Sequence, residues 1–171
     1  MVKVKRLHED AVIPRYAKSG DSGFDLAAVE DVIIEPGETK VVPTGLAFEI
    51  PLGYEMQVRP RSGISRKTKL RVVLGTIDSG YRGEVGVIID NTSMIEYASM
   101  PRFAAGIQVG DNDFNITKPT KYEAIKIRKG DRIAQGVIVP VSQVTFEEVE
   151  DLSESERGDG CFGSTGTSIL E

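Results

Sequence analysis

Five short stretches of the chain combine glycine with polar or charged residues. They are residues 22–26 (SGFDL), 59–63 (RPRSG), 75–84 (GTIDSGYRGE), 130–135 (GDRIAQ) and 157–166 (RGDGCFGSTG). Glycine lets successive backbone N–H groups converge on an anion, and arginine offers a planar pair of donors that suits phosphate. A carboxylate near such groups can take a proton from water. These residue types favour phosphate binding with a carboxylate as general base.

The last stretch, residues 157–166, carries the anion-binding pattern most fully. Its four glycines are accompanied by the hydroxyl donors Ser164 and Thr165 and by the guanidinium of Arg157. A mobile tail with this set is typical of a lid that closes over phosphate with an arginine finger. A glycine-rich tail with no ligand fits the same residues.

The other stretches are each open to two interpretations. Ser62 and the amides after it can begin a helix and bind an anion, or Ser62 can simply cap that helix. Asp78 can be a general base, or it can hold a turn. Asp25 can serve a cation or cap a turn, while Arg132 and Gln135 can be polar residues at a strand edge.

The elements that position these stretches are expected to be short strands. Apolar and polar residues alternate with period two in residues 2–5, 54–58 and 125–127, as in half-buried strands. Runs rich in β-branched residues predict buried strands at 32–34, 85–89 and 137–141. Turn residues lie between them at 35–37, 43–45, 51–53, 78–80 and 129–131. Many short strands with closely spaced turns predict an all-β sandwich or barrel.

Three further segments complete the expected organisation. Residues 62–68 predict one short helix with Ser62 as its N-cap. Residues from about 92 to 121 lack clean periodicity and are expected to be an insertion between two strands. The tail beyond Thr145 is acidic and then glycine-rich, so it should be mobile until something orders it. We therefore expect one domain over residues 1–145 and a flexible arm over residues 146–171.

Composition excludes several kinds of partner and site. The 171 residues carry a net charge of −5, which disfavours general binding of a nucleic-acid backbone. No apolar run approaches a membrane span and no apolar signal segment is visible, so we expect a cytoplasmic protein. With Cys161 and His8 as the single cysteine and histidine, an intramolecular disulfide and a zinc site of Cys and His ligands are excluded. Catalysis must therefore use carboxylates, Arg or Lys, hydroxyls, backbone amides or an added metal.

In their order and in their amino-acid sequences, the five stretches resemble the five motifs of the trimeric dUTPase family. The resemblance runs from about Ser22 to Gly166 and is interrupted by residues 92–121, as in phage-type members that carry an insertion. It implies an all-β, distorted jelly-roll-like β-barrel of the β-clip kind. It also implies a homotrimer whose active sites lie at subunit interfaces, with three chains contributing to each. The implied activity is dUTP diphosphatase, which hydrolyses dUTP to dUMP and pyrophosphate with Mg²⁺ as cofactor.

The resemblance assigns roles around the nucleoside. Asp78 would orient and deprotonate the water that attacks the α-phosphorus. Backbone groups around Thr76 and Ile77 would pair with the uracil edge. Tyr81 would pack under the deoxyribose and exclude a 2′-hydroxyl, and Phe162 would stack on the uracil ring.

The resemblance also assigns two groups of residues to the phosphates. The first group, on the barrel, is Arg61, Ser62, Gly63 and Gln135. The second group, on the arm, would close over the β- and γ-phosphates: Arg157, Gly163, Ser164 and Thr165. Mg²⁺ would be bound chiefly by the three phosphates and by water, with Asp25 contacting it through water.

Two positions depart from the family pattern. Cys161 stands where the last motif usually has glycine, and a positive φ there would strain it by roughly 1–2 kcal/mol. Cys161 can equally be interpreted as a small buried thiol. Val72 stands where some relatives carry an asparagine that contacts uracil, which leaves base recognition to the backbone.

Two other functions share parts of the pattern. A dCTP deaminase has the same fold and nucleotide class, but intact residues 81–83 (YRG) and 162–165 (FGST) argue against it. A nucleotide-sensing regulator would bind a protein partner through residues 92–121. The insertion can equally be an exposed segment without a function of its own, because loops tolerate added length.

Overall fold

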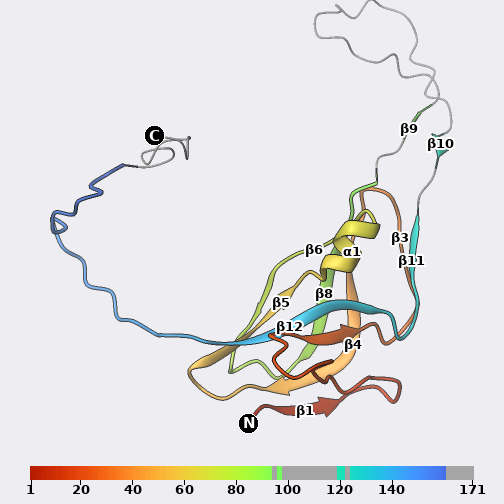
Figure 1. The fold of residues 1–171 in the computed structure, drawn as a ribbon, viewed down its shortest axis with the longest axis horizontal. Helices are drawn as coiled ribbons and strands as arrows, with labels where there is room; N and C mark the ends of the chain where they lie inside the picture. Colours follow the sequence, from red (N-terminus) through yellow and green to blue (C-terminus); the bar gives the residue numbers. More distant parts are fainter. Residues whose placement is uncertain (94–95, 98–118, 122–123, 161–171) are drawn as a thin grey trace, which may run out of the picture.

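Two antiparallel four-stranded sheets dominate the fold. The computed structural model describes residues 1–93, 96–97, 119–121 and 124–160. The first sheet has the order β1-β4-β8-β6, with β1 at Lys3–Arg6, β4 at Thr39–Glu49, β8 at Glu84–Asn91 and β6 at Leu70–Val72 (Figure 1). The second has the order β2-β12-β5-β7, with β2 at Phe24–Ala27, β12 at Arg132–Pro140, β5 at Tyr54–Arg59 and β7 at Gly75–Ile77.

Smaller elements complete the described part of the chain. β3 (Val32–Ile34) pairs with β11 (Ile125–Ile127), and β9 (Glu96–Tyr97) pairs with β10 (Pro119–Lys121). α1 (Ser62–Lys67) is the single helix among these residues. None of their helices is long and apolar enough to span a membrane.

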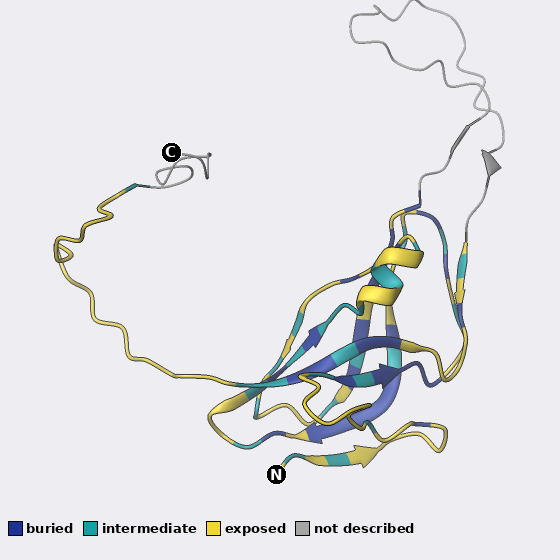
Figure 2. Ribbon diagram, viewed as in Figure 1, coloured by how far each residue is buried: buried dark blue, intermediate teal, exposed yellow. Residues whose placement is uncertain are grey.

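One hydrophobic core joins the two large sheets. On β5, Met56 and Val58 are buried while the alternate side chains point outward, which is the period-two pattern of a half-buried strand. Phe24 of β2 stacks on Phe48 of β4, with ring centroids 6.2 Å apart, so the sheets meet face to face. Figure 2 shows the buried positions concentrated between the sheets. These features confirm the predicted all-β, jelly-roll-like barrel.

The prediction of a turn at residues 43–45 is wrong, because these residues lie inside β4. The pairing with β8 slips from Pro43 opposite Gly86 to Ala47 opposite Glu84, so β4 carries a bulge. Gly45 has φ +66, a conformation that glycine adopts without strain. The buried Thr44 hydroxyl donates to the Val85 carbonyl at 2.6 Å and holds the bulge against β8. A proline and a glycine therefore mark a kink in a long strand here.

The three apolar runs predicted as buried strands are buried only in part. Ile33 is 51% exposed, Ile88 40% and Val141 38%, while their neighbours Ile34, Val87 and Ile89 are buried. The runs therefore belong to sheets with one covered face, and their second apolar face stays open in the single chain. Val41 lies directly opposite Ile88 across β4 and β8 and is 64% exposed.

The ends of the insertion and the start of the arm are described. β9 and β10 pair antiparallel, so the two ends of the 92–121 insertion run side by side; residues 98–118 between them lie outside the described residues. After β12, the Val141 amide donates to the Gly53 carbonyl at 2.8 Å. The chain then leaves the barrel as an exposed segment to residue 160 (Figure 1).

Candidate active site

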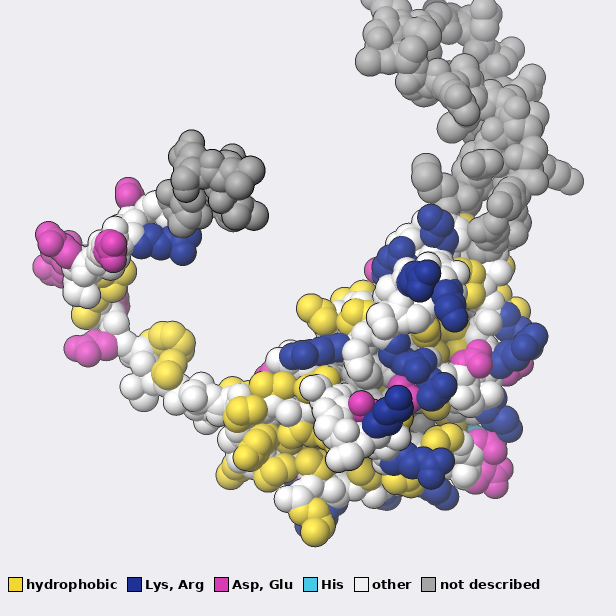
Figure 3. Space-filling model, viewed as in Figure 1, with side chains coloured by type: hydrophobic (Ala, Val, Ile, Leu, Met, Phe, Trp, Pro, Cys, Tyr) yellow, Lys and Arg dark blue, Asp and Glu magenta, His cyan; other side chains and the backbone are white. Residues whose placement is uncertain are grey.

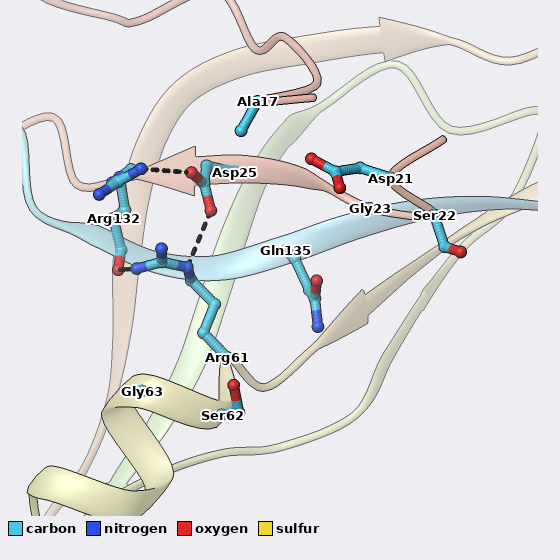
Figure 4. Close-up of a pocket in the computed structure, with 10 residues that line it drawn as sticks. All are labelled: Ala17, Asp21, Ser22, Gly23, Asp25, Arg61, Ser62, Gly63, Arg132 and Gln135. Carbon is cyan, nitrogen blue, oxygen red and sulfur yellow. Dashed lines mark hydrogen bonds and ion pairs between the residues drawn. The ribbon is translucent and has the colours of Figure 1, made fainter. Parts of the chain in front are cut away.

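A pocket of about 350 Å³ brings three of the five motif stretches together. Its walls come from β2 and the residues before it, from the start of α1, and from β12 (Figure 4). Five of the predicted site residues line this pocket: Asp25, Arg61, Ser62, Gly63 and Gln135. We call it the arginine pocket, because Arg61 and Arg132 form one wall of it.

Asp25 is the electrostatic centre of the arginine pocket. One of its carboxylate oxygens pairs with Arg61 Nε at 2.8 Å, and the other accepts from an Arg132 nitrogen at 3.0 Å. Arg61 also donates to the Arg132 carbonyl at 2.8 Å. The Asp25 side chain is 26% exposed, so these contacts lie partly out of water and hold both guanidinium groups in fixed positions.

Arg132, which the sequence allows to be only a polar strand-edge residue, lines the pocket. Residues 132 and 135 are an odd number apart, so a regular strand would point them to opposite faces. The pairing of β12 with β2 slips between Arg132 and Ala134, and this bulge turns both Arg132 and Gln135 toward the pocket. The signal available in sequence was its place in the same GDRIAQ stretch as Gln135.

Gln135 is oriented by two neighbours. Its amide nitrogen donates to the Pro60 carbonyl at 2.9 Å. A Cβ added to Gly23 would lie 2.7 Å from Gln135 Oε1, so only glycine leaves room for the amide in this position. The first motif stretch therefore supports the side chain of the fourth.

Ser62 begins α1 but is not its N-cap, which corrects the prediction. The N-cap is Arg61, in an extended conformation, and the helix start has no side-chain cap. A guanidinium carries donors only, so the Arg61 side chain cannot accept from the helix amides, and it pairs with Asp25 instead. The exposed Ser62 and Gly63 amides belong to the first turn, where N–H groups have no partner within the helix. The hydroxyl and these amides are available to an anion.

The Asp78 turn joins β7 to β8 and is held by its own residues. The Tyr81 amide donates to the Asp78 carbonyl at 3.1 Å, and Arg82 donates to the Ser79 carbonyl at 2.6 Å. The Tyr81 hydroxyl donates to the Glu84 carbonyl at 2.9 Å, and its ring lies over Gly83. The sequence patterns did not single out Arg82, which stabilises this turn through its bond to the Ser79 carbonyl.

Thr76 and Ile77 lie on an edge strand. β7 pairs with β5 only, so in the described part of the chain its other side offers unpaired backbone donors and acceptors. Ile77 packs toward the core opposite Met56, while Thr76 is exposed. Such an edge can pair with a planar polar group such as a nucleobase.

Asp78 does not lie in the arginine pocket. It lines a separate pocket of about 470 Å³, which we call the hairpin pocket, with Glu55, Tyr54 and the start of the arm at Val141. The predicted site residues thus fall into two sets within one chain. Arg157 lines neither pocket, and its Nε donates to the Gly160 carbonyl at 3.0 Å.

Several predicted residues lie outside the described residues. They are Cys161, Phe162, Gly163, Ser164 and Thr165. Among the residues that are described, no three His, Cys, Asp or Glu side chains are grouped as a metal site.

Comparison with known proteins places this geometry in a family. The dUTPase family model matches residues 9–110 and 113–166. The chain belongs to the dUTPase family. The deoxyuridine 5'-triphosphate nucleotidohydrolase of Nautilia profundicola is 46% identical over 167 residues, which cover 96% of this chain and 98% of that protein. The match extends through the stretches that form both pockets.

Solved phage dUTPases have the same fold. The dUTPase of Staphylococcus bacteriophage 80alpha, solved with dUPNHPP and described as controlling the transfer of virulence genes, is 35% identical with a TM-score of 0.80. The alignment covers 98% of this chain and 99% of that one. The dUTPase of phage phi11 of S. aureus, described with a structural Mg(II) ion, is 32% identical with a TM-score of 0.74, over 90% and 99% of the two chains. The resemblance to phage-type members with an insertion is consistent with these neighbours.

Proposed function

We propose that this protein is a dUTP diphosphatase that hydrolyses dUTP to dUMP and pyrophosphate. The observation that carries the proposal is the arginine pocket, where three motif stretches meet around the Asp25–Arg61 ion pair. The activity in the name of the Nautilia profundicola relative supports it, since the match spans nearly all of both chains.

The triphosphate binds in the arginine pocket. Arg61 and the first amides of α1 offer converging donors to phosphate oxygens. Because Asp25 and the Arg132 carbonyl already fix Arg61, the donors need little reorganisation when the substrate arrives. Gln135, oriented by Pro60, adds a neutral donor or acceptor beside them.

The pocket suits a Mg²⁺ ion carried by the phosphates. Both carboxylates that line it, Asp21 and Asp25, are hard oxygen donors of the kind Mg²⁺ prefers. The two Asp25 oxygens are already held by arginines, which favours contact through metal-bound water over direct ligation. When bound, the ion would neutralise charge on the phosphates and favour attack at the α-phosphorus.

Asp78 is the proposed general base, and the turn around it holds the nucleoside. Its exposed carboxylate can accept a proton from the attacking water. The free edge at Thr76 and Ile77 pairs with uracil, and the Tyr81 ring, fixed by its bond to Glu84, supports the deoxyribose. A ring fixed in this way leaves no space for a 2′-hydroxyl, which would exclude UTP.

A complete site then needs more than one chain. Asp78 and Arg61 line different pockets, so the hairpin of one copy must face the arginine pocket of another. We place the copies in a homotrimer. The exposed apolar side chains of Val41 and Ile88, which lie opposite each other on β4 and β8, support this, since closed symmetric assemblies cover such surfaces. The arm of a further copy would bring Arg157, Phe162, Gly163, Ser164 and Thr165 over the substrate.

A protein partner for the 92–121 insertion is a separate proposal. It is supported by the 80alpha dUTPase, which is described as controlling gene transfer. Deletion of residues 98–118 should abolish partner capture and leave hydrolysis intact; partner binding that survives the deletion would refute the idea. We further propose that the protein works in the cytoplasm of a bacterium or of a phage-infected cell, which cell fractionation would test.

The proposed activity is tested by incubating the protein with each dNTP and with UTP, with and without Mg²⁺. We expect conversion of dUTP alone, loss of turnover in EDTA, and dUMP and pyrophosphate as products. Asp78→Asn should lower kcat by roughly 10²–10⁴-fold and keep dUTP binding. Release of ammonia from dCTP, or tight dUTP binding without turnover in the unaltered protein, would contradict the proposal.

A further inference from the structure

The chain is acidic overall, yet one continuous segment is strongly basic. The net charge is −5, but residues 56–77 contain six Lys or Arg and no Asp or Glu. Four of the six are exposed on α1 and next to or on β6: Arg66, Lys67, Lys69 and Arg71. Figure 3 shows Lys and Arg side chains gathered over α1 and the adjoining β11. We call these four residues the α1 basic surface.

The α1 basic surface carries charge that is not neutralised locally. Some other surface lysines are paired, such as Lys3 with Glu49 at 2.7 Å and Lys129 with Asp10 at 3.0 Å. Within the part of the chain that the structure describes, none of the four forms an ion pair. Arg71 instead donates to the Thr68 and Leu70 carbonyls, which neutralise no charge. The surface therefore presents its full positive charge to solvent.

The α1 basic surface leads to the arginine pocket without lining it. α1 begins at Ser62 in the pocket wall and ends at Lys67, about 7.5 Å further along the helix axis. Arg61 and Arg132 line both the arginine pocket and a neighbouring depression of about 410 Å³ that includes Thr68 and Leu70. The two arginines thus form a wall shared by the pocket and the basic side of the molecule.

We propose that the α1 basic surface steers the nucleoside triphosphate into the arginine pocket and sets its association rate. This inference rests on the proposed function. A polyanion approaching an acidic protein is repelled on average, and a local positive field beside the site reverses that repulsion. Such steering raises association rates by about 10–10³-fold and weakens as salt screens it. The four residues act at a distance, so they leave the bound state and the chemical step unchanged.

The test is the association rate constant of the non-hydrolysable analogue dUpNHpp, measured by stopped flow on the full-length protein from low to high salt. The variant carries Arg66→Gln, Lys67→Gln, Lys69→Gln and Arg71→Gln. We expect its association rate at low salt to fall by about 10-fold, while its dissociation rate and kcat stay unchanged. At high salt its association rate should equal that of the unaltered protein. The charge-reversed variant with Arg66→Glu and Lys67→Glu should also lower the association rate.

The matched control removes four charges from β1 and β4, away from α1, with Lys3→Gln, Lys5→Gln, Arg6→Gln and Lys40→Gln. An equal fall in this control would show that only net charge matters and would overturn the proposal. So would an unchanged association rate in the α1 variant, or a raised dissociation rate, which indicates direct contact with bound ligand. Loss of retention on duplex DNA with an unchanged association rate would assign the surface to nucleic acid instead. If the unaltered protein neither binds nor hydrolyses dUTP, the proposed function itself fails.

Discussion

Arg61 Nε and the Asp25 carboxylate lie 2.8 Å apart in a pocket where Asp25 is 26% exposed. The pair joins the residue before α1 to β2, two segments 36 positions apart in the sequence. Arg132 completes the arrangement from β12. This geometry explains why a site for a polyanion contains a carboxylate: Asp25 holds in position the two arginines proposed to bind the phosphates.

Asp25→Asn should weaken catalysis while keeping the fold. The neutral amide cannot hold both Arg61 and Arg132 or the proposed metal-bound water. We expect kcat/KM for dUTP to fall by about 10–100-fold and the Mg²⁺ concentration for half-maximal activity to rise. Steady-state kinetics over a Mg²⁺ series would measure both effects.

The control for this variant is Asp31→Asn. Asp31 pairs with Lys126 at 2.5 Å, but both side chains are 52% exposed, and exposed pairs contribute little. Its kinetics should match those of the unaltered protein. Equal kinetics for Asp25→Asn and Asp31→Asn would argue against a role for Asp25.

Gly83→Ala should disturb sugar recognition through Tyr81. A Cβ on Gly83 would lie 2.6 Å from Tyr81 Cζ, so the ring must leave the position in which it bonds to Glu84. We expect kcat/KM for dUTP to fall roughly 10-fold, in line with the sensitivity of rates to small misplacements, and the preference for dUTP over UTP to shrink. Gly80→Ala on the same turn is the control, because its Cβ would meet nothing within 4 Å. A full preference for dUTP in Gly83→Ala would contradict the role given to Tyr81.

Sequence patterns predicted the architecture well because one signal, the period-two alternation, specifies each strand locally. β5 and β11 lie at the predicted positions. The bulge at Pro43–Gly45 could not be predicted, because a turn residue and a kink residue look alike until the partner strand is known. The runs at 32–34 and 85–89 were predicted as buried strands, yet Ile33 and Ile88 are exposed, because sequence does not tell a core face from a surface that another copy covers.

The resemblance predicted one phosphate-binding group on the barrel, Arg61, Ser62, Gly63 and Gln135, but it did not include Arg132 in that group. The motif sequences pointed to Asp25, Arg61 and Gln135, which line one pocket. The Arg132 side chain reaches the pocket because the pairing of β12 with β2 slips by one residue there. Residue spacing in the sequence does not predict such a slip. The side-chain cap is missing because the helix begins at Ser62 itself and its N-cap, Arg61, has no acceptor; a helix boundary that differs by one residue is not visible in the sequence.

Glu38 should contribute to stability in a pH-dependent way. The Glu35 amide, which donates to Glu38 at 2.8 Å, lowers the pKa of that carboxyl below its ordinary value of 4.5, and Lys40 adds to the shift. Since the folded pKa is the lower one, the stabilisation is present above pH 4.5 and is lost as the pH falls through the folded pKa. Thermal melts should show Glu38→Ala with a lower Tm than the unaltered protein near neutral pH, and a smaller difference in acid. Glu30→Ala, at an exposed carboxylate, should show no such change; a Tm difference for Glu38→Ala that does not vary with pH would contradict the assignment.

Two inactive variants should restore activity when mixed, because Asp78 and Arg61 line separate pockets in one chain. One variant is Asp78→Asn, and the other combines Arg61→Ala with Gln135→Ala. In a closed trimer whose sites each pair the hairpin of one copy with the arginine pocket of the next, every mixed trimer holds one intact site. Three in four randomly assembled trimers are mixed, so equimolar refolding should recover about one quarter of the unaltered kcat. Size-exclusion chromatography would check that both variants and the mixture remain trimeric. Recovery near zero in such trimers would mean that each site draws Asp78 and Arg61 from the same chain, and that the two pockets of one copy come together by a rearrangement within it.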